Sequence, residues 1–278
     1  MTSAEGPGAL LDLIEHYYDA VPRREARVED HGPLTLFVRE GEGWPFYARP
    51  ASGWSGPVRA GDVARVRDRQ RELGIPESFE WVAETTPTLR AAVEGAGLAV
   101  HEHPLMVLGT DAAPVTPEGP PPHPAVRVLE ADDPALPSAL VVPHLAFAEP
   151  GTRVGAADTA DLAEALLART GDGSLERGAA RVRAGLTVIA AAVEGGTALC
   201  AGQHNQVGEV SEIVGVGTLP AARRRGLALA VTAELIADAR SRGVKTVFLS
   251  AGDEDVARIY ARLGFRRAGT ALIAEPAG

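Results

Sequence analysis

The sequence predicts an α/β protein of two domains, with a mixed but mostly antiparallel sheet flanked by helices. From residue 126 onward, runs rich in β-branched residues alternate with segments of helical apolar period. Three of the runs, within residues 186–219, are joined by short turns, which favours antiparallel pairing. A proline-rich segment separates this part of the chain from an N-terminal part with a similar order of elements.

The proline-rich segment is DAAPVTPEGPPPHPA, Asp111 to Ala125, with six prolines in fifteen residues. This composition forms neither a helix nor a central strand and is typical of a stiff, extended linker. The regions on either side, of about 110 and about 150 residues, are ordinary domain sizes. We therefore predict a first domain at residues 1–110, a linker at 111–124 and a second domain at 125–278.

The pattern of the second domain predicts its elements in order. Asp158 or Thr159 opens one helix, and Leu227, Val231 and Leu235 recur four apart on one face of another. The expected order is a strand at 125–131, a helical region at 133–149 interrupted by Pro137 and Pro143, a helix at 158–170, strands at 186–194, 197–207 and 210–219, a helix at 226–243, a strand at 244–252, a helix at 253–264 and a strand at 265–275.

The first domain repeats the end of the second in a degenerate form. Helix, strand, helix and strand are expected at 63–74, 78–85, 86–97 and 98–109. RAAVEGAGL aligns with ARIYARLGF, so that Gly97 matches Gly264 and Val93 stands where the second copy has Tyr260. We interpret this as an internal duplication in which the second copy alone keeps the polar groups, the alternative being chance similarity of two common units.

Composition limits the function classes. The formal net charge is -10 and the pI is about 5.2, which argues against a general nucleic-acid binder and allows a cationic small-molecule substrate. Cys200 is the single cysteine, so intramolecular disulfides and thiolate zinc clusters are excluded, and a small buried residue is expected there. Residues 1–20 contain no basic leader and no long apolar run, so we expect a cytoplasmic protein with no membrane partner.

The segment VGVGTLPAARRRGLALA, Val214 to Ala230, carries the strongest chemical signal. A β-branched run meets Arg223, Arg224 and Arg225, then Gly226, then an apolar helix. The N-terminus of a helix exposes unpaired amides and the positive end of its dipole, so it accepts anions. Arginines add charge-assisted hydrogen bonds to phosphate oxygens. The segment therefore predicts a phosphate-binding turn, without the signatures of a nucleotide P-loop or of a dinucleotide fold.

R-x-x-G-x-A at Arg223 to Ala228, together with ARIYARLGF, resembles the GNAT superfamily of acyl-CoA-dependent N-acyltransferases. The resemblance covers residues 126 to about 275 in element order and extends to motifs from Glu212 to Phe265; the first domain would be a degenerate GNAT-like unit. It implies acetyl-CoA as the acyl donor, with no metal. The implied contacts are backbone groups of Val216 and Thr218 on the pantetheine arm, and the amides of Arg224, Arg225, Gly226, Leu227 and Ala228 with the side chains of Arg223, Arg224 and Arg225 on the pyrophosphate.

The same resemblance implies that Tyr260 is the general acid that protonates the departing thiolate. Glu212 is the favoured base, because it lies on the strand that leads to the loop, on the face that alternation gives to Val214, Val216 and Thr218. A water relay, Glu209 and His204 remain alternatives. For His204 a solvated position near a hairpin turn is expected, and for Glu212 a strand-end carboxylate in water is an equal possibility.

Two functions remain open at this stage. The first is an N-acetyltransferase in which a small, possibly cationic amine attacks the thioester directly. The second is a non-catalytic acyl-CoA-binding or protein-interaction module, which the degenerate first domain suggests. The combination of Arg223, Gly226 and Tyr260 favours the enzyme. Nucleic-acid binding by the arginine triplet lacks an extended basic surface, and the sequence identifies neither the acceptor nor the oligomeric state.

Overall fold

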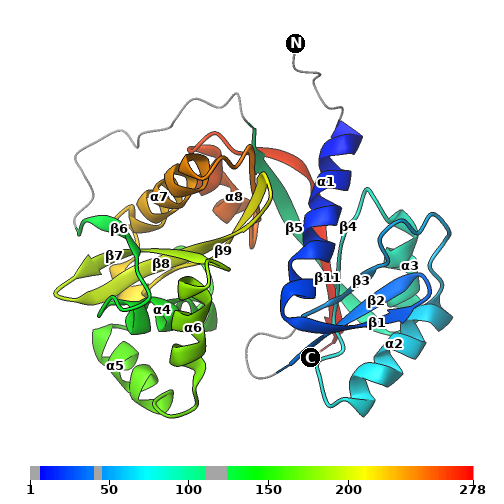
Figure 1. The fold of residues 1–278 in the computed structure, drawn as a ribbon, viewed down its shortest axis with the longest axis horizontal. Coiled ribbons are helices and arrows are strands. Elements are labelled where there is room, and N and C mark those ends of the chain that lie inside the picture. The colour runs from blue at the N-terminus through cyan, green and yellow to red at the C-terminus, as the bar shows by residue number, and fades with distance from the viewer. Residues whose placement is uncertain (1–6, 41–45, 110–123, 278) are drawn as a thin grey trace. The chain divides into compact units, whose positions relative to one another are not determined.

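The computed structural model describes residues 7–40, 46–109 and 124–277, and the chain forms two compact units (Figure 1). Unit 1 comprises Met1–Met106, Ser250–Asp253 and Arg267–Gly278, and unit 2 comprises Val107–Leu249 and Glu254–Arg266. The last strand of the chain therefore belongs to unit 1, although it follows all of unit 2 in sequence. Residues 111–123 of the predicted linker lie outside the described part of the chain.

Unit 1 is a sheet with the strand order β1-β2-β3-β4-β11-β5. The final strand β11 pairs antiparallel with β4, from Ala271 opposite Val82 to Ala274 opposite Phe79. The elements are α1 (Pro7–Ala20), the 3-10 helix η1 (Pro22–Arg24), β1 (Ala26–His31), β2 (Leu34–Arg39), β3 (Ala48–Pro50), α2 (Ala60–Glu72), β4 (Phe79–Val82), α3 (Pro87–Gly95), β5 (Leu98–Leu108) and β11 (Arg266–Pro276).

Alternation along β3 and β4 gives unit 1 two different faces. Phe79 and Trp81 are fully buried in the apolar core against α2 and α3. Glu80 points to the other face, where it forms a buried ion pair with Arg49, and the Arg49 guanidinium lies 4.1 Å from the ring centroid of Tyr18 on α1. Helices therefore cover both faces of this sheet.

Unit 2 is a sheet with the order β10-β9-β8-β7-β6, antiparallel except for the parallel pair β10–β9. This arrangement confirms the predicted mixed, mostly antiparallel sheet. Its elements are β6 (Val126–Leu129), α4 (Leu136–Ala148), α5 (Thr159–Ala168), α6 (Ser174–Arg183), β7 (Val188–Glu194), β8 (Thr197–Val207), β9 (Val210–Thr218), the 3-10 helix η2 (Pro220–Ala222), α7 (Leu227–Ser241), β10 (Thr246–Ser250) and α8 (Glu254–Ala261).

The helices α4 and α7 lie on opposite faces of the unit 2 sheet (Figure 1). A Cβ atom at Gly217 of β9 would lie 2.8 Å from the Cα atom of Pro143, so α4 approaches one face closely. A Cβ at Gly202 of β8 would lie 3.3 Å from Leu235 of α7 on the other face. Glycine at both positions permits this close packing.

Local details follow the sequence in part. Asp158 caps α5, because its carboxylate accepts hydrogen bonds from the amides of Ala160 and Asp161. The predicted interruption of 133–149 is wrong: α4 runs through Pro143, while Pro137 lies in its first turn, where no amide bond is needed. The short helix α6 had no predicted counterpart. In the described ranges no helix is both long and apolar enough to cross a membrane.

Candidate active site

The strand-to-helix junction is a loop at residues 219–227 between β9 and α7, which we call the junction loop. Gly226, at the N-cap of α7, has φ 77° and ψ 7°. Arg224 has φ 68°, the only positive φ of a non-glycine residue in the described ranges. Among the described residues, no backbone carbonyl accepts a hydrogen bond from the amide of Arg224, Gly226 or Leu227. Left-handed residues beside the free amides of a helix N-terminus form an anion-binding turn.

The three arginine side chains of the junction loop differ in their contacts. The guanidinium of Arg223 donates to the carbonyls of Ala146, Arg153 and Glu149, at 2.9 Å and 3.2 Å for the first two. It is therefore engaged with backbone groups, whereas we expected it at the pyrophosphate. Arg225 forms an exposed ion pair with Glu194 at 2.9 Å. An exposed pair of this kind contributes little stability, so it can open to meet a ligand.

The outer edge of β9 is open beside the junction loop. β9 pairs with β8 from Val210 to Thr218 with one irregularity, whereas among the described residues it pairs with β10 only from Val210 to Glu212. Leu219 donates its amide to Leu199 of β8 at 2.8 Å, so alternation directs the backbone groups of Thr218 away from β8. The end of β9 therefore offers unpaired strand edge to an extended ligand.

A β-bulge changes which side chains share a face of β9. Gln203 pairs with Val214 and Ala201 with Gly217, so Gly215 and Val216 together oppose one residue of β8. Gly215 has φ 65°, which is typical of such a bulge. The prediction that Glu212 shares a face with Val216 and Thr218 is therefore wrong, because the extra residue reverses the alternation.

Tyr260 lies on α8 and is buried. Its ring packs edge-on against Phe265, with centroids 6.0 Å apart and 63° between the ring planes. Burial, and then the nearby Cys200, raise the pKa of the Tyr260 hydroxyl above its ordinary value of about 10. The hydroxyl therefore keeps its proton at neutral pH, as a general acid must.

Cys200 of β8 and Thr218 of β9 are cross-strand partners on the face toward Tyr260. The Thr218 hydroxyl donates to the Cys200 sulfur at 3.2 Å. Burial raises the pKa of Cys200 to about 12, although this hydrogen bond acts in the opposite direction. Cys200 is thus a protonated, buried thiol, which confirms the expectation of a small packed residue.

The carboxylates considered as a base lie in different surroundings. Glu212 is half-buried, opposite Asn205 of β8 and beside Phe248 of β10, where the pairing of β9 with β10 ends. Glu209 is exposed and pairs with Lys245 at 2.7 Å. Glu212 thus stands where the two strands separate, and Glu209 stands in solvent.

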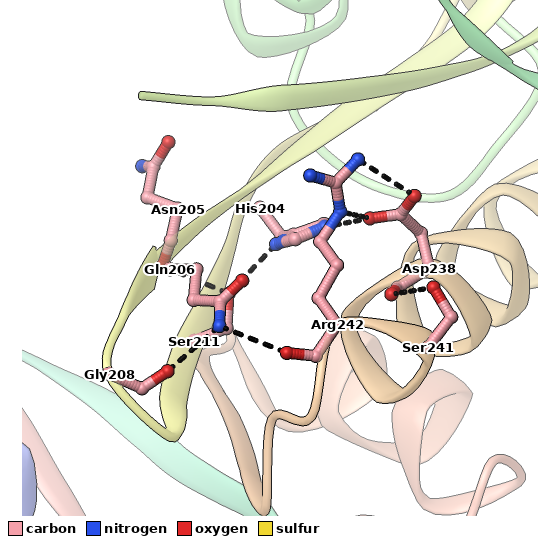
Figure 2. Close-up of polar contacts among 8 residues, drawn as sticks. All are labelled: His204, Asn205, Gln206, Gly208, Ser211, Asp238, Ser241 and Arg242. Carbon is pink, nitrogen blue, oxygen red and sulfur yellow. Dashed lines mark hydrogen bonds and ion pairs between the residues drawn. The ribbon is translucent and has the colours of Figure 1, made fainter. Parts of the chain in front are cut away.

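His204 is not solvated, contrary to our expectation: it is 1 % exposed and belongs to a buried network (Figure 2). Its Nε2 lies 2.9 Å from a carboxylate oxygen of Asp238 on α7, and its Nδ1 lies 2.9 Å from the hydroxyl of Ser211. Asp238 also pairs with Arg242. Burial lowers the pKa of His204, although the bond to Asp238 opposes the shift. The network therefore connects β8 and β9 to α7 through a buried histidine.

Ser211, His204 and Asp238 have the composition of a hydrolase triad. Ser211 has no exposed surface, and its hydroxyl also lies 2.9 Å from the carbonyl oxygen of Asn205. A nucleophile must reach a substrate carbonyl, which this hydroxyl does not. We interpret the network as a structural one.

Comparisons with known proteins agree with this architecture. The model of the family described as FR47-like protein matches residues 193–273. A GCN5-related N-acetyltransferase from Kribbella flavida is similar in structure, with TM-score 0.66 and 22% identity over 97% of this chain and 96% of that chain. One from Sphaerobacter thermophilus has TM-score 0.53 and 17% identity, covering 88% and 81%.

A tandem GNAT protein from the clavulanic acid biosynthesis pathway has TM-score 0.53 and 14% identity, covering 100% of this chain and 97% of that chain. No curated protein sequence matches the chain. At these identities the similarity establishes the fold, which is that of the GNAT N-acetyltransferases, and the family-model match confirms the resemblance to this superfamily.

Proposed function

We propose that the protein is an N-acetyltransferase that transfers an acetyl group from acetyl-CoA to a small amine. The observation that carries the proposal is the open edge of β9, which ends at an anion-binding turn and has the buried, protonated Tyr260 beside its last residues. An open strand edge, an anion-binding turn and a buried acid are the three features that the pantetheine arm, the pyrophosphate and the departing thiolate of acetyl-CoA would require.

The donor would be held mainly by the backbone. Groups of Val216 and Thr218 on the open edge would pair with the pantetheine arm, as an added strand would. The amides of Arg224, Arg225, Gly226, Leu227 and Ala228 would hold the pyrophosphate, together with the side chains of Arg224 and Arg225. Arg223 is left out of this group, since its guanidinium is engaged with carbonyls and its amide donates to the carbonyl of Pro220 at 3.3 Å.

Acetyl transfer from the thioester to an amine requires the transfer of two protons. The acceptor amine loses a proton as it attacks the thioester carbonyl, and the sulfur gains one as the bond to carbon breaks. Tyr260 would donate the second proton. Glu212, at the point where β9 and β10 separate, would accept the first directly or through water. The net charge of -10 favours an acceptor that is itself cationic.

The alternative is a module that binds acyl-CoA or a protein without catalysis. Titration calorimetry with acetyl-CoA, followed by release of free thiol with a panel of amines, separates the two. The enzyme binds and turns over at least one amine, whereas the module binds without turnover. Absence of acetyl-CoA binding by the intact chain would overturn both the enzyme and the acyl-CoA-binding module, and would favour a protein-interaction module.

The base is tested by the pH dependence of the reaction. Glu212→Gln should remove the acidic limb of the kcat/KM profile, because an amide accepts no proton at these pH values. Glu209→Gln, at an exposed carboxylate three positions away, is the matched comparison and should leave the profile unchanged. An unchanged profile in Glu212→Gln would show that water, and not Glu212, accepts the proton of the amine.

A further inference from the structure

Arg223 connects the junction loop to the segment Glu149–Ala157, which we call the post-α4 segment. Its guanidinium donates to the carbonyls of Ala146 and Glu149 at the C-terminal end of α4, and to that of Arg153 within the segment. The last carbonyls of a helix have no partner inside the helix, so a donor here stabilises the helix end. One side chain thus holds both the end of α4 and the chain that follows it.

Further hydrogen bonds join the same two segments. The amide of Gly155 donates to the carbonyl of Pro220 at 3.1 Å, and the amide of Ala221 donates to the carbonyl of Ala157 at 3.0 Å. Within the post-α4 segment, the carboxylate of Glu149 accepts from the amide of Ala156 at 3.2 Å. The conformation of the post-α4 segment therefore depends on the position of the junction loop.

The post-α4 segment starts beside the end of β9. Gly217, next to Thr218, packs against Pro143 and Ala146 near the end of α4. Val154 in the segment and Phe147 at the end of α4 are both more than half exposed. Two exposed apolar side chains thus lie close to the end of β9, the strand assigned to the acyl arm.

We propose that Arg223 is a positioning residue that couples acetyl-CoA binding to the order of the post-α4 segment; the proposal rests on the function proposed above. Arg223 immediately precedes Arg224, whose φ of 68° orients the amides of the junction loop. When an anion binds, these amides reorient toward it. This reorientation shifts the backbone of Arg223 and, with it, the guanidinium. The three carbonyls it binds transmit that shift to the post-α4 segment.

Hydrogen exchange of backbone amides measures this coupling. In the wild type, acetyl-CoA should slow exchange at Gly155 and Ala156 as well as at Ala228 in the first turn of α7. In Arg223→Gln without ligand, Gly155 and Ala221 should exchange about tenfold faster, and acetyl-CoA should bind about tenfold more weakly, the scale of charged hydrogen bonds. Protection of Ala228 by the ligand should remain, while that of Gly155 is lost.

The matched control is Arg240→Gln. Arg240 also donates to backbone carbonyls, those of Leu108, Gly109, Val244 and Lys245. Its removal should lower stability in a similar way without changing the response of Gly155 to acetyl-CoA. This control separates loss of coupling from general destabilisation.

Kinetics and two further variants complete the test. Arg223→Gln should raise the acceptor KM about tenfold while kcat at saturation changes less than about threefold, and Arg223→Lys should restore part of the loss, because a lysine keeps the charge without the fork of donors. Gly155→Ala should act in the same direction, since its Cβ would overlap the Glu149 carboxylate and displace it from Ala156.

Different outcomes overturn different statements. Equal protection of Gly155 by acetyl-CoA in the wild type and in Arg223→Gln overturns the coupling alone. Absence of acetyl-CoA binding by the wild type overturns the proposed function and the coupling with it, whatever the exchange rates without ligand.

Discussion

Tyr260 distinguishes the two helix–strand units that we interpret as copies of one another. In the first copy the equivalent position is Val93, which is fully buried, and both units turn at a left-handed glycine, Gly97 with φ 83° and Gly264 with φ 89°. The fold therefore accepts either side chain at this position. What the tyrosine adds is a buried hydroxyl whose pKa is raised, next to the strand end with the open edge.

We expect Tyr260→Phe to keep the fold and lose most of the activity. The ring would still pack on Phe265, so the melting temperature should change little. Removal of a general acid typically lowers kcat by about 10²–10⁴-fold. Thiol release and acetyl-CoA titration together check this: kcat should fall while the dissociation constant stays within about threefold of the wild type. A variant of undiminished kcat would exclude Tyr260 as the acid.

The raised pKa of Tyr260 also predicts how kcat depends on pH in the alkaline range. A pKa above the ordinary value of about 10 means that the acid is still protonated at pH 9. The wild-type kcat should therefore not decline between pH 7 and pH 9 through loss of this proton, which a pH–rate profile measures directly. A decline in this range that is absent from Tyr260→Phe would contradict the shift.

At the scale of elements, the sequence predicted strands and helices better than it predicted faces. The runs that became β7, β8 and β9, and the cap of α5 by Asp158, follow from local patterns. The bulge at Gly215 does not, because strict alternation along Glu212 to Thr218 has no place for an extra residue. The glycines of VGVG were its one visible signal, since glycine inside a strand marks bulges.

Local sequence patterns did not predict the contacts between residues that are far apart in the sequence. His204 and Asp238 are 34 positions apart, and Arg223 reaches carbonyls 70 to 77 positions away. Both the buried state of His204 and the use of Arg223 depend on which helix packs on which face. Tertiary packing, rather than local propensity, decided these two positions.

The network of His204 should make stability depend on pH. Burial lowers the pKa of folded His204, whereas a histidine in the unfolded chain titrates near 6.5. Below that value the unfolded state binds the additional proton, so the free energy of unfolding should fall as the pH decreases from about 7 to about 5. The carboxylate of Asp238, whose pKa Arg242 and His204 lower against the effect of burial, adds a loss only on further acidification.

Denaturant unfolding at several pH values tests this network. His204→Gln should be less stable at pH 7, by about 1–3 kcal/mol for a buried hydrogen-bonded group. Its stability should also vary less between pH 7 and pH 5 than that of the wild type. His101→Gln, at an exposed histidine, is the control and should keep the wild-type dependence. Equal pH slopes in His204→Gln and wild type would show that His204 does not titrate on unfolding in this range.

At the scale of the whole molecule, the chain builds unit 1 from both of its ends. Strand β11 supplies Leu272 and Ala274 to the core of unit 1 and receives the amide of Ala83 through the carbonyl of Thr270 at 2.9 Å. We therefore expect residues 1–110 alone to aggregate or remain unfolded, because β4 would lose a paired edge and its apolar cover. Fusion of residues 267–278 through a flexible linker should restore a cooperative thermal transition, and a stable fragment without them would contradict this assignment.

The similarity of the two units in sequence raises the question of how many donor sites the molecule has. The segment of unit 1 that leads into the first turn of α2, SGPVRAGDV, carries one arginine where the junction loop carries three. We expect acetyl-CoA to bind with a stoichiometry of one per chain. Gly226→Val should abolish this binding, because a β-branched residue is strained at φ 77° and its side chain would crowd the anion-binding turn. Titration of both proteins decides the matter: a second binding event in the wild type, or full-stoichiometry binding retained in Gly226→Val, would place a donor site outside the junction loop.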